Sequence, residues 1–166
     1  LMDGAINAFV DKKGFGLKKF ANDEEKKKKE EKDKSMKMSE RLNLYKDRQR
    51  NNLSENAYGA IVRLRIDNSH PLGFGYDKEY LSLKLRNRRY AYLESGWNVG
   101  TTQDSSSIVS GFVGFKAKQN FRESLVFGVE EIGRGSVVYM VDNPLFRGFW
   151  YNGKLLFGNA VFLVGS

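Results

Sequence analysis

A run of charged residues near the amino end most constrains what this chain can fold into. Residues 23–34 read DEEKKKKEEKDK, with six acidic side chains, six basic ones and no apolar one. Such a segment cannot join a hydrophobic core, so it predicts a solvated linker or an exposed helix. The run therefore divides the chain into an N-terminal helix and short strand (1–22), a charged linker (23–53) and an α/β accessory domain (54–166).

The residue types that are missing exclude several kinds of chemistry. The 166 residues include no cysteine and one histidine, which rules out thiolate nucleophiles, disulfides and thiolate metal sites. A zinc site needs several nitrogen or carboxylate ligands around one ion. A Gly-x-Ser-x-Gly elbow, a Walker A loop and a dinucleotide-binding loop are also absent from the sequence. We therefore predict that this chain is not an enzyme and holds no cofactor.

The charge and hydropathy also argue against two kinds of partner, nucleic acid and a membrane interior. The formal net charge is +8, but the acids and bases of the charged run cancel, and a phosphate-binding tract needs uncancelled positive charge. We therefore expect no nucleic-acid partner. No apolar stretch approaches the ~18 residues that a membrane-spanning helix needs, so we expect no membrane span.

Beyond the charged run, the residue pattern predicts a sheet with few helices. Residues 60–66 alternate as a half-buried strand, and Leu81, Leu83 and Leu85 alternate with polar residues in a second strand. Residues 125–131 and 136–141 flank a glycine-rich turn as a β-hairpin, with the run 137–141 buried on both faces. Residues 96–107 are predicted to form a loop.

The carboxyl end is predicted to close with a helix over 145–164. Asp142 or Asn143 would cap it, with Pro144 in its first turn. We expect Phe146, Phe157 and Phe162 to pack on the sheet. At the amino end, a short amphipathic helix is predicted over Leu1–Lys13.

Ten residues stand out as candidates for a site or a structural motif. A surface for an anionic ligand would use arginines interleaved with tyrosines, and the arginines are Arg63, Arg65, Arg86, Arg88 and Arg89. Ion pairing, capping and turn formation are the roles expected of His70, Glu130, Arg134, Asp142 and Arg147. Glu130 or its neighbour Glu131 would pair with Arg134 or Arg147, since adjacent strand residues point to opposite faces and form no catalytic pair.

Several segments together resemble the C-terminal region of bacterial proteins whose N-terminal part is a zinc carboxypeptidase domain. The longest and most specific is Gly133–Arg147, which reads GRGSVVYMVDNPLFR. The shorter matching segments are 67–76, 109–112, 125–131 and 153–160, and the charged run ahead of them is also similar. The resemblance covers about two thirds of the chain.

The resemblance implies a partial flavodoxin-like, class I glutamine-amidotransferase-like sheet, truncated at the N-terminus. Active domains of that kind use a cysteine and a histidine, so no amidotransferase activity carries over to a chain without cysteine. The zinc ligands belong to the carboxypeptidase part. The expected function is a non-catalytic accessory domain, with the upstream catalytic domain or a second copy as partner. The alternative is a binding module for an anionic ligand. The parents resemble periplasmic or secreted proteins.

Overall fold

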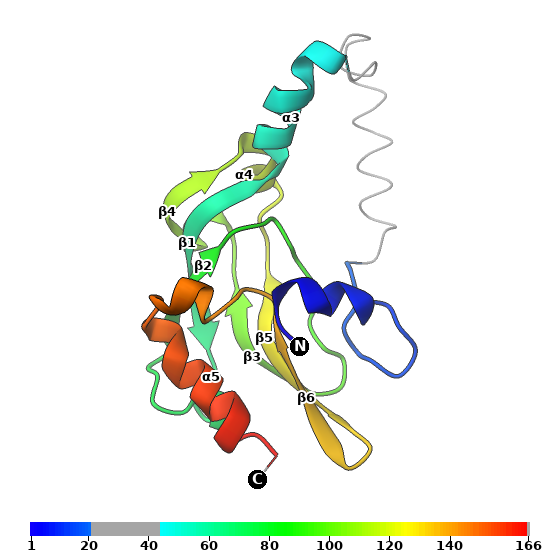
Figure 1. The fold of residues 1–166 in the computed structure, drawn as a ribbon, viewed down its shortest axis with the longest axis vertical. Coiled ribbons are helices and arrows are strands. Elements are labelled where there is room, and N and C mark those ends of the chain that lie inside the picture. The colour runs from blue at the N-terminus through cyan, green and yellow to red at the C-terminus, as the bar shows by residue number, and fades with distance from the viewer. Residues whose placement is uncertain (21–43, 166) are drawn as a thin grey trace.

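A computed structural model of the chain describes residues 1–20 and 44–165 (Figure 1). The charged run 23–34 lies outside the described residues, as does most of the predicted linker. The remainder of that linker contains the 3-10 helix η2 (Tyr45–Asp47) and the start of helix α3 (Arg48–Glu55), which continues across the predicted domain boundary.

The centre of the fold is one sheet of six strands. The strands are β1 (Ala57–Ile66), β2 (Glu79–Lys84), β3 (Trp97–Thr102), β4 (Ile108–Val113), β5 (Ser124–Ile132) and β6 (Gly135–Met140). Their order is β2–β1–β3–β5–β6, with β4 also paired to β1, and all these pairs are antiparallel. Strand β1 pairs with β4 along its first half and with β3 at its last residues, so the sheet curls around this long strand (Figure 1).

The remaining elements are short apart from one C-terminal helix. They are η1 (Asp3–Ala8), η3 (Pro71–Gly73), η4 (Ser105–Ser107), α4 (Phe115–Gln119), η5 (Phe146–Gly148) and α5 (Asn152–Phe162). No helix in residues 1–20 and 44–165 is both long enough and apolar enough to cross a membrane.

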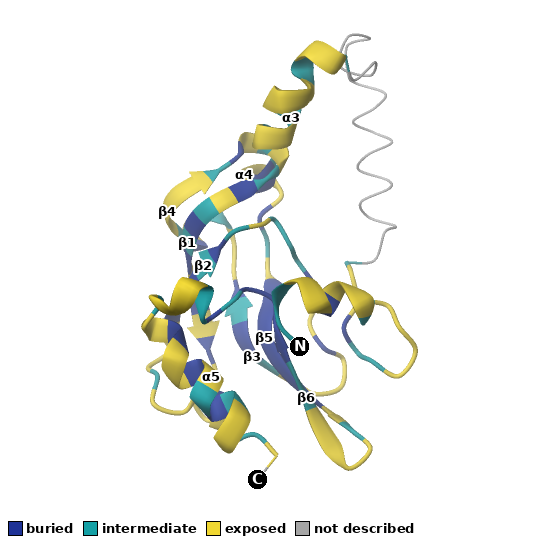
Figure 2. Ribbon diagram, in the orientation of Figure 1, coloured by how far each residue is buried: buried dark blue, intermediate teal, exposed yellow. Residues whose placement is uncertain are grey.

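The sheet is covered on its two faces by segments from opposite ends of the chain. Gly16 donates to Glu130 on one face of β5, and Ile6 and Leu17 of the same N-terminal segment are fully buried. On the other face Phe127 packs against Tyr80, whose neighbour Tyr76 is hydrogen-bonded to α5. Figure 2 shows the buried residues concentrated in β5 and in the inward sides of the flanking elements. Residues 1–20 are therefore docked on the domain and share its core.

The coarse fold prediction is confirmed, because the chain forms a mixed α/β fold with an antiparallel sheet and few helices. A flavodoxin-like fold has a mainly parallel sheet, and that finer prediction is not confirmed. The predicted β-hairpin is present as β5 and β6, with Gly133 at φ +63° in the turn.

Several detailed predictions are wrong. The N-terminal helix is a 3-10 helix of six residues, η1. Strand β5 is buried on both faces, whereas Val137 and Val138 of β6 are only half-buried and the predicted burial holds for residues 139–141. In β2 the buried side chains are Tyr80, Ser82 and Lys84, while Leu81 points outward. The predicted loop 96–107 contains strand β3 and the short helix η4.

The closing helix begins later than predicted because the backbone is broken ahead of it. Arg147 and Gly148 have left-handed φ values of +51° and +71°, and α5 starts only at Asn152. The buried residues of α5 are Gly153, Leu156 and Asn159. Phe157 and Phe162 are 37% and 77% exposed, so neither is a core residue and that prediction is wrong.

Candidate functional site

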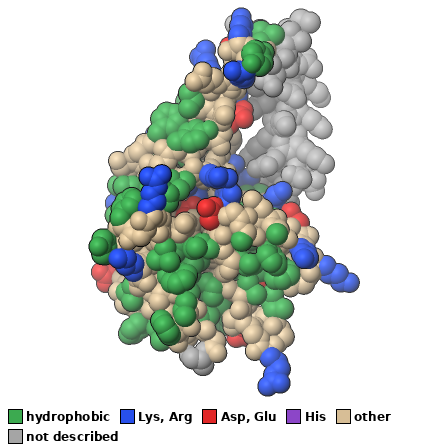
Figure 3. All heavy atoms as spheres, viewed as in Figure 1, with side chains coloured by type: hydrophobic (Ala, Val, Ile, Leu, Met, Phe, Trp, Pro, Cys, Tyr) green, Lys and Arg blue, Asp and Glu red, His purple; other side chains and the backbone are tan. Residues whose placement is uncertain are grey.

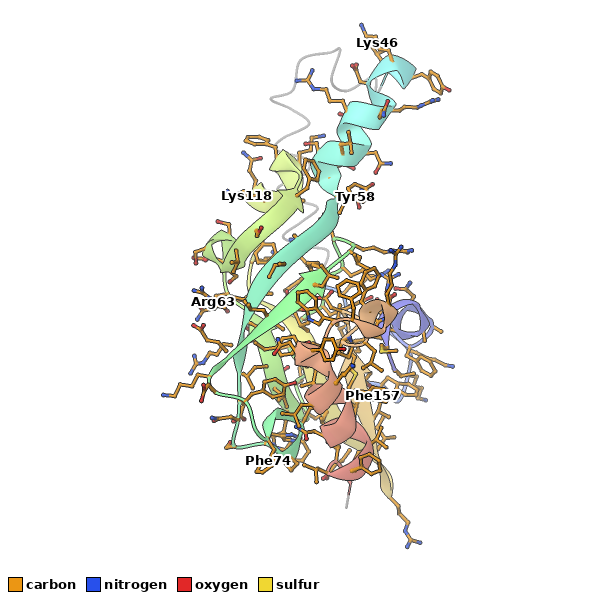
Figure 4. The ribbon with its side chains drawn as sticks, turned by 60° about the vertical axis from the view of Figure 1, so that its left-hand side comes forward. Lys46, Tyr58, Arg63, Phe74, Lys118 and Phe157 are labelled. Carbon is orange, nitrogen blue, oxygen red and sulfur yellow. The ribbon has the colours of Figure 1, made fainter. Side chains whose placement is uncertain are left out.

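The five candidate arginines do not form one surface. Arg63 and Arg65 project from the exposed face of β1, where the Nε atom of Arg63 lies 3.3 Å from a carboxylate oxygen of Glu79 (Figure 4). Arg86, Arg88 and Arg89 follow the end of β2. Since Lys84 pairs with Ala60, that end of β2 lies roughly 15–20 Å along β1 from Arg65, at ~3.3 Å per residue.

Arg86 and Arg88 line a small cavity of about 10 Å³, and Arg88 and Arg89 line a larger one. The larger cavity has a volume of about 290 Å³, and its wall is formed by Asn7, Lys19, Phe20, Asn87, Arg88, Arg89 and Tyr90. Arg88 forms an ion pair with Asp3, and Arg89 donates to the carbonyl oxygen of Asn120. The anionic-ligand hypothesis stays a prediction; of the two cavities that these arginines line, the one with Arg88 and Arg89 has the larger volume.

Glu130 has different partners from those predicted. Its carboxylate accepts a hydrogen bond of 2.6 Å from the Tyr139 hydroxyl and one of 2.9 Å from the Gly16 amide. Arg134 instead lies exposed in the hairpin turn, and the guanidinium of Arg147 lies over the Phe146 ring. Burial raises the pKa of Tyr139, and the neighbouring Glu130 raises it further. Glu130 therefore holds the N-terminal segment to β5.

His70 caps a turn of the backbone. Its Nδ1 atom accepts a hydrogen bond of 3.0 Å from the Leu72 amide at the start of η3, and its ring centre lies 5.4 Å from that of Trp97. Partial burial lowers the pKa of the imidazole. Among the described residues, no three His, Cys, Asp or Glu side chains form a group that could hold a metal ion.

Asp142 is part of a buried ion pair and does not cap a helix. Its carboxylate lies 3.1 Å from the ammonium of Lys84 and accepts a hydrogen bond of 2.9 Å from the Ser82 hydroxyl. Lys84 is 1% exposed and Asp142 is 7% exposed. This pair explains the orientation of β2, because Ser82 and Lys84 must point inward to reach Asp142.

The feature that best qualifies as a functional site is the outer surface of α5. The helix carries a single charged residue, Lys154, within its eleven residues. Exposed apolar side chains remain on its outer side and on the loop beside it, and together they define the α5 patch: Phe74, Tyr151, Leu155, Phe157, Val161 and Phe162. Figure 3 shows hydrophobic side chains gathered over the part of the molecule where α5 lies, and Figure 4 labels Phe157 on α5 and Phe74 on the neighbouring loop.

The α5 patch is as large as the largest apolar patch of a typical monomer, which is a size that often marks a functional surface. Phe74, Tyr151 and Phe162 are 64%, 75% and 77% exposed. At roughly 200 Å² for each aromatic side chain, these three alone expose on the order of 400 Å². The largest apolar patch of a typical monomer is about 300–600 Å² and often functional. Leu155, Phe157 and Val161 extend the patch further.

The sequence contained a signal for this surface. An amphipathic surface helix has one apolar side, whereas the segment 152–162 is apolar around its circumference. We predicted burial against the sheet from the same residues, but the sheet can contact only one side of a helix. No protein-family model, curated protein or solved structure matches this chain.

Proposed function

We propose that this chain is a non-catalytic accessory domain that docks through the α5 patch onto the catalytic region of a larger zinc-carboxypeptidase-like protein. The observation that supports docking is that α5, a helix with a single charged residue, exposes large apolar side chains on the surface of the folded domain. The choice of partner rests on the resemblance of Gly133–Arg147 and its neighbouring segments to the C-terminal region of that protein class. A periplasmic or secreted location is part of the same proposal.

The physical reason for docking is the cost of keeping the α5 patch in water. Burying apolar surface contributes about 25 cal/mol per Å², so covering on the order of 400 Å² corresponds to ~10 kcal/mol before the costs of association. Those costs are smaller when both surfaces belong to one polypeptide, because the partner is always nearby. Lys154 and Asn152 are exposed on the same helix and can supply polar contacts, and the Lys154 ammonium lies 3.7 Å from the centre of the Tyr151 ring.

Hydroxyl-radical footprinting of the longer polypeptide, compared with the 166-residue chain, tests the docking. We expect oxidation of Phe162 to fall at least fivefold in the longer polypeptide. Tyr45 is a matched control because it is also an aromatic residue with 77% exposure, and it lies outside the patch in η2. Equal labelling of Phe162 in both proteins would refute the proposal.

The same proposal predicts the behaviour of the 166-residue chain alone. It should release no C-terminal amino acid from a peptide panel with zinc added, and a Phe162→Glu variant should bind less of a hydrophobic dye than a Tyr45→Glu variant. Both substitutions are on the surface, so the free energy of unfolding should stay within about 0.5 kcal/mol of that of the unmodified chain. Peptide hydrolysis above that of a His70→Ala variant would contradict the non-catalytic assignment.

A further inference from the structure

The first residue of the chain already pairs with the outer edge of β6. The Leu1 amino nitrogen donates to the Val138 carbonyl at 2.7 Å, and the Met140 amide donates to the Leu1 carbonyl at 2.8 Å. In a parallel pair of strands, the N–H and C=O groups of a residue bond to the residues just before and just after the one with which it is paired. Leu1 is therefore paired with Tyr139 in the parallel direction, and Met2 forms a parallel bridge with Met140.

The same edge continues beyond Leu1 with groups that have no partner in the described structure. Val141 donates to Val126 of β5, so alternate residues of β6 face β5 and the residues between them face outward. The outward groups next to Leu1 are the Val138 amide and the Ser136 carbonyl. None of the residues in 1–20 or 44–165 hydrogen-bonds to either group.

The surroundings suit a strand with apolar side chains. Val137 and Val138 are half-buried and pack against the core, so residues placed opposite them would extend existing apolar contacts on both faces.

We propose that the edge of β6 from Ser136 to Val138 is a docking site for an extended strand that runs parallel to β6 and is joined to the nitrogen of Leu1. The second residue ahead of Leu1 would be paired with Val137. Its amide would donate to the Ser136 carbonyl, and its carbonyl would accept from the Val138 amide. Addition of a strand to an open sheet edge is a common mode of peptide recognition, and an uncovered edge otherwise invites pairing with another chain.

Two N-terminal extensions of the chain test this site. One adds Thr-Val-Thr ahead of Leu1, and the matched control adds Thr-Pro-Thr, which removes the amide that would donate to Ser136. Hydrogen exchange of the Val138 amide is the readout. We expect its exchange to slow at least tenfold with Thr-Val-Thr, relative to the unextended chain, and to slow much less with Thr-Pro-Thr.

Three results would overturn the proposal. They are unchanged exchange of the Val138 amide with Thr-Val-Thr, equal slowing with both extensions, and protection that appears only in a dimer detected by light scattering. The last result would assign the edge to a second copy of the chain. The readout is local to β6, so its failure is distinguishable from failure of docking through the α5 patch.

Discussion

Replacing Asp142 with asparagine should destabilise the fold more than any other polar substitution discussed here. The substitution keeps the shape of the side chain but removes its charge, and the ammonium of Lys84 is then left 1% exposed without a counter-ion. Removing one partner of a buried pair costs ~3–5 kcal/mol, because the other charge remains buried. A domain of this size is stable by ~5–15 kcal/mol, so Asp142→Asn removes a large share of its stability.

Urea unfolding followed by circular dichroism measures this effect, and two further variants show its origin. Lys84→Met combined with Asp142→Leu removes both charges, so its free energy of unfolding should recover most of the loss caused by Asp142→Asn. The exposed pair between Arg63 and Glu79 is the control. Glu79→Gln should cost less than ~1 kcal/mol, because solvent screens a surface pair.

The reasoning would be refuted by an Asp142→Asn variant that unfolds within ~0.5 kcal/mol of the original chain. That result would mean that the Lys84 ammonium reaches water in the folded chain and does not depend on Asp142. A double variant no more stable than Asp142→Asn would instead show that the loss comes from altered packing around Asp142.

Two further predictions concern His70 and the N-terminal segment. Because burial lowers the pKa of His70, the unfolded chain binds its proton more readily; the free energy of unfolding should be largest above the ordinary pKa of ~6.5 and should fall as the pH drops below it. His70→Asn keeps an acceptor for the Leu72 amide and should reduce this fall in pH-dependent urea titrations, whereas an unchanged profile would show that His70 has no part in it. Ile6→Ala should cost ~2–5 kcal/mol, since Ile6 is fully buried. A melting temperature unaffected by Ile6→Ala would show that residues 1–20 do not contribute to the core.

The sequence predicted correctly those elements whose structure depends on residues close together in the chain. The strand β1 alternates Val62, Leu64 and Ile66 with two arginines, and its buried face is the one predicted. The hairpin of β5 and β6 was predictable for a similar reason, because glycines mark the turn between two apolar runs. In both cases the residues that decide the structure lie within a few positions of one another.

The errors come from contacts between distant residues. Period-two alternation in β2 is compatible with either face, and the choice is made by Asp142, 58 residues beyond Lys84. Strand β3 contains Asn98 and Gly100, which are typical of loops. Gly100 is nevertheless needed in the strand, since a Cβ atom there would lie 2.6 Å from the ring of Phe127.

The α5 patch was not predicted as a site, because its helical residues were expected to pack on the sheet. The apolar residues of 152–162 were recognised, and burial was the correct expectation for such a helix. The described chain, however, offers one face of the sheet, which accommodates Gly153, Leu156 and Asn159. Two of these three buried residues are a glycine and an asparagine, so most of the large apolar side chains of α5 are not buried in this domain. The larger apolar side chains, including Leu155 and Phe162, point the other way and are exposed, and this exposure is the observation behind the proposed docking of α5.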